Sequence, residues 1–259
     1  NLNIPILGTI PLHKFKSKHT KLVVLDNPKA EISEAIRTIR TNLDFMIPNN
    51  HGKKLISVTS TIGSEGKTFI SVNLGAIIAM SKKKVILLDL DMRKPKLHMA
   101  LGKENNLGMS NILAGQNNLE EIIRNSDYEN LDFISSGPPP PNPSELILLP
   151  ELNTVIEKLK EIYDVIIIDS PPIGLVTDGL LIMKKVDLSL YIIKSEFSKR
   201  SFLKNIEKLQ SQNQIKHMAI VFNSVKKRGG AYGYGYGYGY MDASGYYEES
   251  KNKSIFNLF

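Results

Sequence analysis

The stretch TIGSEGKT, residues 61–68, carries residue types that bind phosphate groups. It follows an apolar run rich in β-branched residues and precedes a helical pattern, and it ends in Gly-Lys-Thr. In such a loop, glycines allow backbone N–H groups to converge on phosphate oxygens, and the helix N-terminus adds partial positive charge. Lys67 would reach the β- and γ-phosphates of a nucleotide, and the Thr68 hydroxyl would bind Mg²⁺. The predicted nucleotide-binding residues of the loop are Gly63, Ser64, Glu65, Gly66, Lys67 and Thr68.

Three carboxylates stand at the ends of apolar runs, where they could hold the metal that a phosphate loop needs. Asp169 ends DVIIIDSPP, and Asp89 and Asp91 end VILLDLDMRKP. Residues two apart on a strand point to the same side, so both members of the pair could face the phosphates. One could bind the metal while the other accepts a proton from the attacking group. The alternative for the pair is a polar strand end that caps the next loop.

Two cations follow this pair, in the run MRKP. Arg93 and Lys94 could stabilise phosphate charge at the same edge of the fold, or they could be solvated loop charges. The sequence leaves both interpretations open.

Apolar runs alternate with helical patterns along most of the chain. Near-continuous apolar strands separated by helices predict an α/β fold, a mostly parallel sheet covered by helices on both faces. Ligands of such sheets bind at the carboxyl ends of the strands. The expected strands are 4–11, 54–60, 84–91, 131–135, 164–170, 188–194 and 217–223, and the expected helices include 30–46, 67–81, 144–163 and 198–212.

Composition excludes several classes of protein. The chain of 259 residues is 42% hydrophobic and 23% charged, as in a globular protein, and its net charge of +7 fits an anionic ligand or a membrane surface. No dense Lys/Arg block favours nucleic acid, so no nucleic-acid partner is expected. Cysteine is absent. That removes disulfides, thiol nucleophiles, zinc–thiolate sites and iron–sulfur clusters.

The two ends of the sequence differ from the rest. No apolar run is long enough to span a bilayer, and the start at Asn1 with the strand-like IPILGTIP predicts a piece of a longer protein. In the middle of the chain, SSGPPPPNPSEL is a proline-rich loop. The C-terminal end is low in complexity: after the last strand the sequence becomes basic and then rich in glycine and tyrosine. Seven of the ten tyrosines fall there, at Tyr232, Tyr234, Tyr236, Tyr238, Tyr240, Tyr246 and Tyr247. A disordered tail over residues 229–259 is expected, which could serve as a self-associating segment.

Taken together, these motifs resemble the bacterial tyrosine kinases. The resemblance rests on SVTSTIGSEGKT, VILLDLDMRKP, GPPPPNPSEL, VIIIDSPPIGLVTD and the tyrosine cluster, and it extends from about Ile4 to the end. It implies the phosphate-loop NTPase fold, with ATP and Mg²⁺ as cofactors. Thr61 replaces the first glycine of the strict loop, and Ile62 stands where partition and division-site ATPases carry a second lysine. The nitrogenase-reductase relatives need cysteine ligands and are excluded.

The resemblance also implies roles for single residues. Lys67, Asp89 and Asp91 would be catalytic, with one aspartate as the general base, and Thr68, Asp91 and Asp169 would hold the metal. Asn223 matches an asparagine that binds adenine in related ATPases, although a strand-end turn residue is the alternative. Glu34, Arg37 and Arg40 match a motif that packs on the next subunit of a ring such as an octamer; a solvated helix stripe is the alternative.

Within the family, the match is to the cytoplasmic kinase domain of polysaccharide co-polymerases. This implies autophosphorylation of the tail tyrosines in trans, control of capsule or exopolysaccharide synthesis and export, and a place at the cytoplasmic face of the bacterial inner membrane. The implied partners are other copies of the chain, a membrane-spanning part of the same protein, a tyrosine phosphatase and the polysaccharide export machinery. Residues 1–30 would be a strand and connection, 31–228 the kinase domain and 229–259 the tail. The alternative function is a regulatory phosphate-loop ATPase without kinase activity.

Overall fold

The computed structural model describes residues 4–13, 22–47, 52–213, 215 and 217–226. Their centre is an eight-stranded sheet in the order β1-β8-β7-β2-β6-β3-β5-β4. Every neighbouring pair is parallel except β4 and β5, which are antiparallel. The strands are β1 (Ile6–Pro11), β2 (Lys54–Ser60), β3 (Val85–Asp89), β4 (Arg124–Tyr128), β5 (Leu131–Ile134), β6 (Val165–Asp169), β7 (Leu188–Lys194) and β8 (Met218–Val225).

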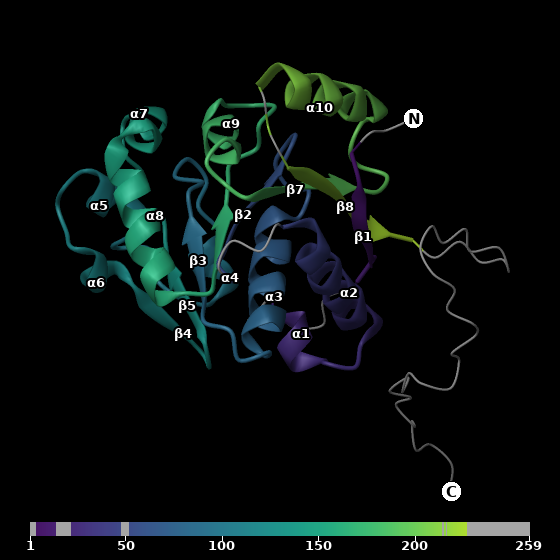
Figure 1. The fold of residues 1–259 in the computed structure, drawn as a ribbon, viewed down its shortest axis with the longest axis horizontal. Coiled ribbons are helices and arrows are strands. Elements are labelled where there is room, and N and C mark those ends of the chain that lie inside the picture. Colours follow the sequence, from purple (N-terminus) through teal and green to yellow (C-terminus); the bar gives the residue numbers. More distant parts are fainter. Residues whose placement is uncertain (1–3, 14–21, 48–51, 214, 216, 227–259) are drawn as a thin grey trace, which may run out of the picture.

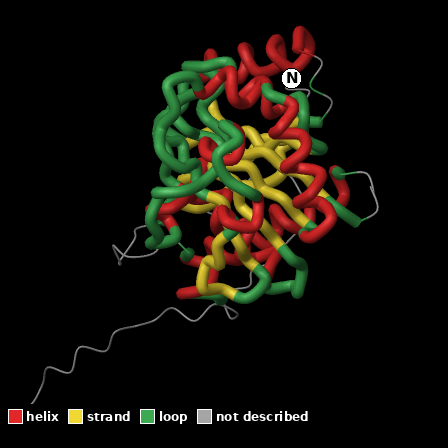
Figure 2. The backbone as a smooth tube through the Cα atoms, turned by 90° about the vertical axis from the view of Figure 1, so that its left-hand side faces the viewer, coloured by secondary structure: helices red, strands yellow, loops and turns green. Residues whose placement is uncertain are grey.

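Helices cover both faces of this sheet. One face carries α1 (Val23–Asp26), α2 (Glu31–Met46), α3 (Lys67–Ala79) and α4 (Leu97–Ala100), and the other carries α5 (Met109–Leu113), α6 (Leu119–Ile122), α7 (Pro143–Leu148), α8 (Pro150–Ile162), α9 (Asp178–Met183) and α10 (Arg200–Asn213). In Figure 1, α9 and α10 lie on one side of β7 while α2 lies on the other. Figure 2 shows the strands in yellow between the red helices.

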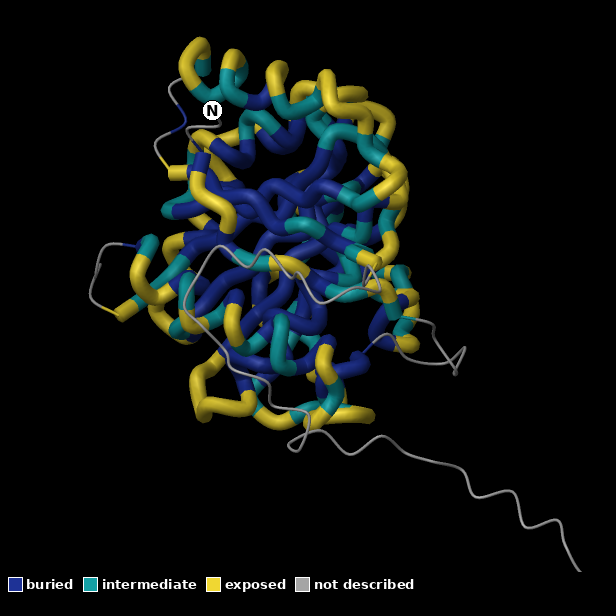
Figure 3. Tube along the Cα trace, turned by 90° about the vertical axis from the view of Figure 1, so that its right-hand side faces the viewer, coloured by how far each residue is buried: buried dark blue, intermediate teal, exposed yellow. Residues whose placement is uncertain are grey.

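The central strands are buried on both faces, which explains their nearly continuous apolar sequences. All of β3 and β6 is buried, and so is β2 beyond its first residue. In Figure 3 the buried residues fill the sheet and the exposed residues lie on the surrounding helices and loops. The α/β fold expected from the sequence is therefore confirmed.

Several details differ from the expected elements. The strand expected over 84–91 ends at Asp89, which leaves Asp91 on the following loop rather than on the strand. The edge strand β4 was not expected, because its sequence RNSDY is polar. In the structure its residues alternate in burial, as those of an edge strand do. The expected helix over 144–163 is two helices, α7 and α8. Leu149 between them is extended, with φ −60° and ψ 145°, because the residue before Pro150 is pushed out of the helical region. The short helix α1 had no clear signal in the sequence either.

The sheet brings the motifs to one edge. The strands β2, β3 and β6 end at Ser60, Asp89 and Asp169, and the register pairs Asp89 directly with Asp169. The loops that follow these three strand ends are 61–66, 90–96 and 170–177. Among the described residues, no helix combines the length and the apolar character needed to cross a membrane. The predicted tail, residues 229–259, lies outside the described residues.

Candidate active site

The phosphate loop leaves β2 and enters α3 through a glycine that no other residue could replace without strain. Gly66 caps the helix with φ +104°, in the left-handed region. A Cβ at this position would lie 2.1 Å from Asn223 Nδ2. The next residue, Lys67, opens the helix and is only 7% exposed. The loop thus has the tight strand-to-helix turn that the sequence predicted, with its lysine directed into the protein rather than into solvent.

The hydroxyl of Thr68 is directed at the end of β6. Thr68 Oγ1 donates to Asp169 Oδ2 at 2.5 Å. Ser71, one turn further along α3, has its Oγ 3.5 Å from Asp169 Oδ1. The structure therefore brings together the hydroxyl and the carboxylate that the sequence assigned to the metal.

The two aspartates at the end of β3 have different surroundings. Asp89 is fully buried, and its carboxylate accepts the backbone N–H groups of Asp91 (3.1 Å), Lys96 (3.2 Å) and Leu97 (3.0 Å). Asp91 is half-buried and accepts one backbone N–H, from Lys94 at 3.1 Å. Asp89 thus fixes the loop that follows β3, whereas Asp91 lies on that loop at the more open side of the site.

Burial raises the pKa of all three carboxylates. For Asp89, burial and then the nearby charge of Asp169 raise the pKa well above its ordinary value. The pKa of Asp169 is raised to about 6 by burial, with the Lys67 charge opposing the rise, and the pKa of Asp91 is raised in the same way. A cluster of buried carboxylates around one lysine is electrostatically unfavourable until more positive charge arrives.

This arrangement fits a magnesium ion that is shared with a nucleotide. The described residues contain no group of three or more His, Asp or Glu side chains suited to hold a metal by themselves. Mg²⁺ does not need one, because it is bound through one or two carboxylates together with substrate phosphates and water. Thr68 and Asp169 would hold the ion, with Asp91 nearby. Its positive charge would lower the pKa of these carboxylates and stabilise their ionised form.

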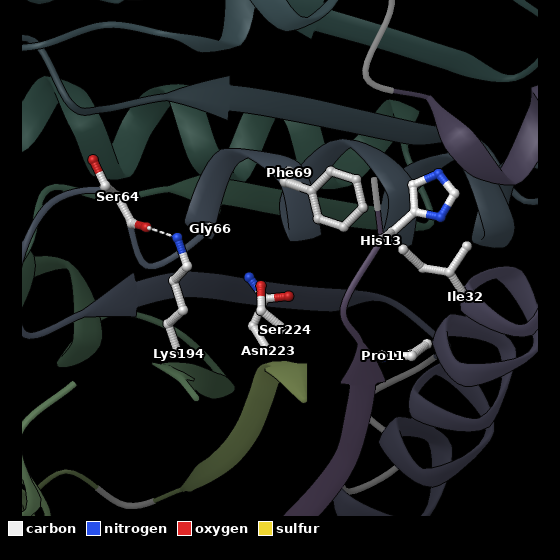
Figure 4. Close-up of a pocket in the computed structure, with 9 residues that line it drawn as sticks. All are labelled: Pro11, His13, Ile32, Ser64, Gly66, Phe69, Lys194, Asn223 and Ser224. Atoms are coloured by element: carbon white, nitrogen blue, oxygen red, sulfur yellow. Dashed lines mark hydrogen bonds between the residues drawn. The ribbon is translucent and has the colours of Figure 1, made fainter. Parts of the chain in front are cut away.

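A cavity of about 180 Å³ opens beside the loop. Figure 4 shows Phe69, Gly66, Lys194 and Asn223 around it. Asn223 is 7% exposed, and its Nδ2 donates to Glu65 O at 2.9 Å. The asparagine that the sequence assigned to adenine thus lines the cavity and also holds the phosphate loop through its hydrogen bond to the Glu65 carbonyl. The remaining lining residues are Pro11, His13, Ile32, Ser64 and Ser224.

The side chain of Glu65 is directed away from the nucleotide face of the loop. It is fully buried; Oε2 accepts the Ile62 N–H at 2.9 Å, and Oε1 accepts the Ser198 hydroxyl. Only the backbone N–H of Glu65 could therefore take part in the phosphate binding predicted for this residue. Sequence reasoning missed Ser198, which lies 133 residues further along the chain and has no motif around it.

Thr61 takes the place of the first glycine of the strict loop and has partners of its own. Its hydroxyl is hydrogen-bonded to the hydroxyl of the buried Tyr191 on β7, and its carbonyl accepts the Gly174 N–H at 2.9 Å. A Cβ on Gly174 would lie 2.5 Å from that carbonyl, so this close approach requires glycine. The threonine hydroxyl therefore ties the phosphate loop to β7, and the backbone carbonyl ties it to the segment after β6.

Arg93 has a role that neither sequence interpretation included. Its Nε donates to Asp178 Oδ2 at 3.0 Å and its second terminal nitrogen donates to Ser144 Oγ at 2.9 Å. Ser144 also donates to Asp178, which is 1% exposed. The loop after β3 is thus tied to α7 and α9. Arg93 is held by a carboxylate, while Lys94 is exposed.

The predicted oligomer residues lie along α2. Glu34 and Arg37 form an ion pair, and both side chains are partly exposed, as is Arg40. The buried face of the same helix, with Ile32, Ile36, Ile39 and Leu43, packs into the core. The tyrosines predicted as phosphoacceptors lie outside the described residues.

Known proteins are similar to this chain in sequence and in fold. A family profile described as AAA domain matches residues 53–220. Tyrosine-protein kinase YwqD of Bacillus subtilis is 35% identical over 174 residues, which cover 67% of this chain and 73% of that protein. Tyrosine-protein kinase wzc of Salmonella typhi is 36% identical over 220 residues, which cover 83% of this chain but 30% of that protein.

A solved structure agrees with these relatives. The kinase domain of the Escherichia coli tyrosine kinase ETK is 29% identical and has a TM-score of 0.79, with 91% of this chain and 95% of that chain covered. The family and enzyme class predicted from the motifs are confirmed, and the chain corresponds to less than a third of the length of wzc. The chain belongs to the bacterial tyrosine kinases, protein-tyrosine kinases built on a phosphate-loop domain.

Proposed function

We propose that the chain uses Mg·ATP to phosphorylate the tyrosine cluster of a neighbouring copy of itself. The observation that carries the proposal is the meeting of Lys67, the Thr68–Asp169 pair and Asp91 at one edge of the sheet, beside a cavity that reaches the phosphate loop. The kinase names of the relatives support the same chemistry.

Mg·ATP, when bound, supplies the phosphoryl group and the metal charge that offsets the negative charge of the reaction. The chain supplies position and electrostatics, which dominate the catalysis of phosphoryl transfer. Lys67 would lie along the phosphates, where its charge stabilises the transferring group. Thr68 and Asp169 would orient the metal. The backbone N–H groups of residues 63–68 would surround the phosphate oxygens.

We assign the proton-accepting role to Asp91 rather than Asp89. A general base needs an oxygen that an incoming hydroxyl can reach. The carboxylate of Asp89 is fully buried and already accepts three backbone N–H groups. Asp91 is half-buried, accepts one, and lies close enough to Lys67 for the lysine charge to oppose the rise of its pKa. Asp91 would take the tyrosine proton as the tyrosine oxygen bonds to the γ-phosphorus and the bond from that phosphorus to the β–γ bridging oxygen breaks, with ADP as the leaving group.

The tyrosine cluster suits such a site as a substrate. Single glycines between Tyr232 and Tyr240 leave each hydroxyl accessible and allow several registers to enter one narrow site. The 18 steps from Gly229 to Tyr247 reach roughly 60 Å when extended and roughly 25 Å on average as a flexible chain. That reach allows the active site of a neighbouring subunit, and it makes transfer in trans feasible.

The proposed assembly is a ring in which Glu34, Arg37 and Arg40 contact the next subunit. This chain matches 30% of the length of wzc. We propose that it is the kinase domain of a longer protein, joined to a membrane-spanning part and located at the cytoplasmic face of the inner membrane. In this setting the kinase would control capsule or exopolysaccharide synthesis and export, and a tyrosine phosphatase would reverse the modification.

A mixing experiment tests transfer in trans. A chain with Lys67→Met and an intact tail is mixed with a chain that has Lys67 but phenylalanine at all seven tail tyrosines, and Mg·ATP is added. Phosphotyrosine on the Lys67→Met chain supports the proposal. ATP hydrolysis without any phosphotyrosine would favour the alternative, a regulatory ATPase. Phosphotyrosine in the unaltered chain but none in the mixture would indicate transfer in cis.

A further inference from the structure

The carbonyl groups of the phosphate loop are held from outside the loop. Four of them accept a hydrogen bond from a residue outside the loop. Of the four donors, only Asn223 was predicted from the sequence to bind the nucleotide. The pairs are Gly174 N with Thr61 O (2.9 Å), Ser60 Oγ with Ile62 O (2.7 Å), Lys194 Nζ with Ser64 O (3.3 Å) and Asn223 Nδ2 with Glu65 O (2.9 Å).

This pattern fixes the direction of the N–H groups. In a planar trans peptide the C=O of one residue and the N–H of the next point in opposite directions. A donor that holds Ser64 O outward therefore turns the Glu65 N–H to the other side, and a donor on Glu65 O does the same for the Gly66 N–H. Ser64 itself has φ +67°, which is uncommon for a residue with a side chain, so its orientation needs external support.

Much of that support comes from one turn, residues 194–198, at the end of β7. Figure 4 shows the Lys194 side chain reaching across the cavity to Ser64, the contact marked by a dashed line. Lys194 Nζ also lies 4.9 Å from the centre of the Phe197 ring, which restrains the ammonium group. Four residues further on, Ser198 donates its hydroxyl to the Glu65 carboxylate and accepts the Lys194 N–H at 2.9 Å.

The turn is held by its own backbone hydrogen bonds. The Lys194 carbonyl accepts the N–H groups of Phe197 (3.2 Å) and Ser198 (2.9 Å), and Glu196 takes a left-handed conformation with φ +58°. The Ser195 N–H donates to Asn223 O at 2.8 Å, which joins the turn to the other strand that supports the loop. The turn and the end of β8 are thus hydrogen-bonded to each other, and both contact the loop.

We propose that the turn Lys194–Ser198 is a positioning element for the phosphate loop. Lys194 acts on the Ser64 carbonyl and Ser198 acts on the Glu65 carboxylate, so one turn orients two successive loop residues. The Glu65 carboxylate is fully buried, and loss of the Ser198 hydroxyl would leave it with the Ile62 N–H as its partner. An under-satisfied buried carboxylate is unfavourable, and the loop would shift to hydrate it.

The inference rests on the nucleotide site of the proposed function and not on tyrosine phosphorylation. Its probe is therefore fluorescent N-methylanthraniloyl-ADP with Mg²⁺, titrated into the full chain. We expect Ser198→Ala to weaken binding about tenfold and Lys194→Met about fivefold, because each removes a hydrogen bond in which one partner is charged. Ser198→Thr and Lys194→Arg keep the donors and should restore most of the affinity.

Lys199→Ala is the matched control, because Lys199 is exposed and directly follows the turn. Thermal melting without nucleotide shows whether each variant is folded, and kinase assays should show a raised KM for ATP with a smaller change in kcat. Equal affinity of the unaltered chain, Ser198→Ala and Lys194→Met would overturn the inference and leave the proposed function intact. A lack of nucleotide binding by the unaltered chain would overturn both.

A double-mutant cycle with Glu65→Gln separates positioning from general destabilisation. Ser198 acts through Glu65, so Ser198→Ala should weaken binding much less in the Glu65→Gln background than in the unaltered chain. If Ser198→Ala weakens nucleotide binding by the same factor in both backgrounds, the proposed path from Ser198 through Glu65 to the loop is contradicted.

Discussion

The Thr68 hydroxyl and the Asp169 carboxylate lie 2.5 Å apart and join the phosphate loop on α3 to the end of β6. Asp169 is 2% exposed and is paired across the sheet with the equally buried Asp89. The arrangement concentrates negative charge where a nucleotide-bound metal would neutralise it. The protein thus keeps the proposed metal-binding groups in place at a cost to the stability of the unbound state.

That cost predicts a dependence of stability on pH. The pKa of Asp169 is about 6 in the folded chain and about 3.9 when unfolded. Because the folded value is the higher one, the stabilising contribution is present below about pH 4 and is lost as the pH rises through 6. Asp169→Asn removes the buried charge. We expect it to stabilise the nucleotide-free protein by up to about 3 kcal/mol at pH 8 and by about half of that at pH 5.

Urea unfolding of both proteins at pH 5, 6 and 8 measures this difference. The same variant should bind Mg·nucleotide more weakly, because the carboxylate proposed to hold the metal is gone. A difference in unfolding free energy that stays constant from pH 5 to pH 8 would show that Asp169 does not titrate in this range.

The two aspartates after β3 should separate into a structural and a catalytic residue. Asp89→Ala leaves three backbone N–H groups without their acceptor, and we expect a loss of about 2–4 kcal/mol in unfolding free energy. Asp91→Ala removes the acceptor of one N–H at a half-buried position and should cost less than about 1 kcal/mol.

The phosphorylation rate, unlike the stability, should depend strongly on Asp91. Asp91→Ala should lower kcat about 10²- to 10⁴-fold with a nearly normal melting temperature, as loss of a general base does. Time courses of tail phosphorylation at saturating Mg·ATP give kcat, and differential scanning fluorimetry gives the melting temperature. An Asp91→Ala chain with normal kcat would transfer the assignment to Asp89 or to another group.

The ion pair between Arg93 and Asp178 should hold the loop that carries Asp91. Arg93→Met leaves the buried Asp178 carboxylate with Ser144 as its partner, and we expect a loss of about 2 kcal/mol. The double variant Arg93→Met with Asp178→Asn removes the unpaired charge and should recover part of the loss. Lys94→Met, on the same loop but exposed, is the control and should unfold like the unaltered chain.

Assembly should depend on the exposed charges of α2 and on the modification state of the tail. Arg37→Glu with Arg40→Glu should abolish the ring, since both side chains lie on the face that the proposal gives to the next subunit. Full phosphorylation of seven tyrosines adds about −10 to −14 charges to a chain of +7, so crowded tails should repel and loosen the ring. Native mass spectrometry before and after phosphatase treatment measures this; equal ring populations would contradict it.

The sequence predicted what short motifs determine locally. Gly-Lys-Thr after an apolar strand led directly to the loop that places Lys67 and Thr68, because a strand, a turn and a helix suffice to form it. Asp169 was expected near Thr68 because the carboxyl ends of parallel strands lie at one edge of the sheet. The strands were found because burial on both faces leaves long apolar runs. The proline-induced break at Pro150 was also readable in principle, but the helical pattern on both sides concealed it.

Contacts between distant residues that belong to no motif were not predictable. Ser198 beside Glu65, and Arg93 beside Asp178, depend on which strands become neighbours, and a serine or an exposed arginine carries no periodic signal. The polar edge strand β4 was missed for a similar reason, since only its pairing with β5 makes it a strand. The structure thereby distinguishes Asp89 from Asp91, which the sequence could not do.

Mapping of phosphate by mass spectrometry, after purified chain is incubated with Mg·ATP, tests the central claim most directly. The account predicts phosphotyrosine between Tyr232 and Tyr247, lost in Lys67→Met. It predicts none at Tyr163, which is 5% exposed and bonded to Asp132, or at Tyr191, which is 1% exposed and bonded to Thr61. ATP turnover with an unmodified tyrosine cluster, or modification that persists in Lys67→Met, would contradict the assignment of this chain as a kinase of its own tail.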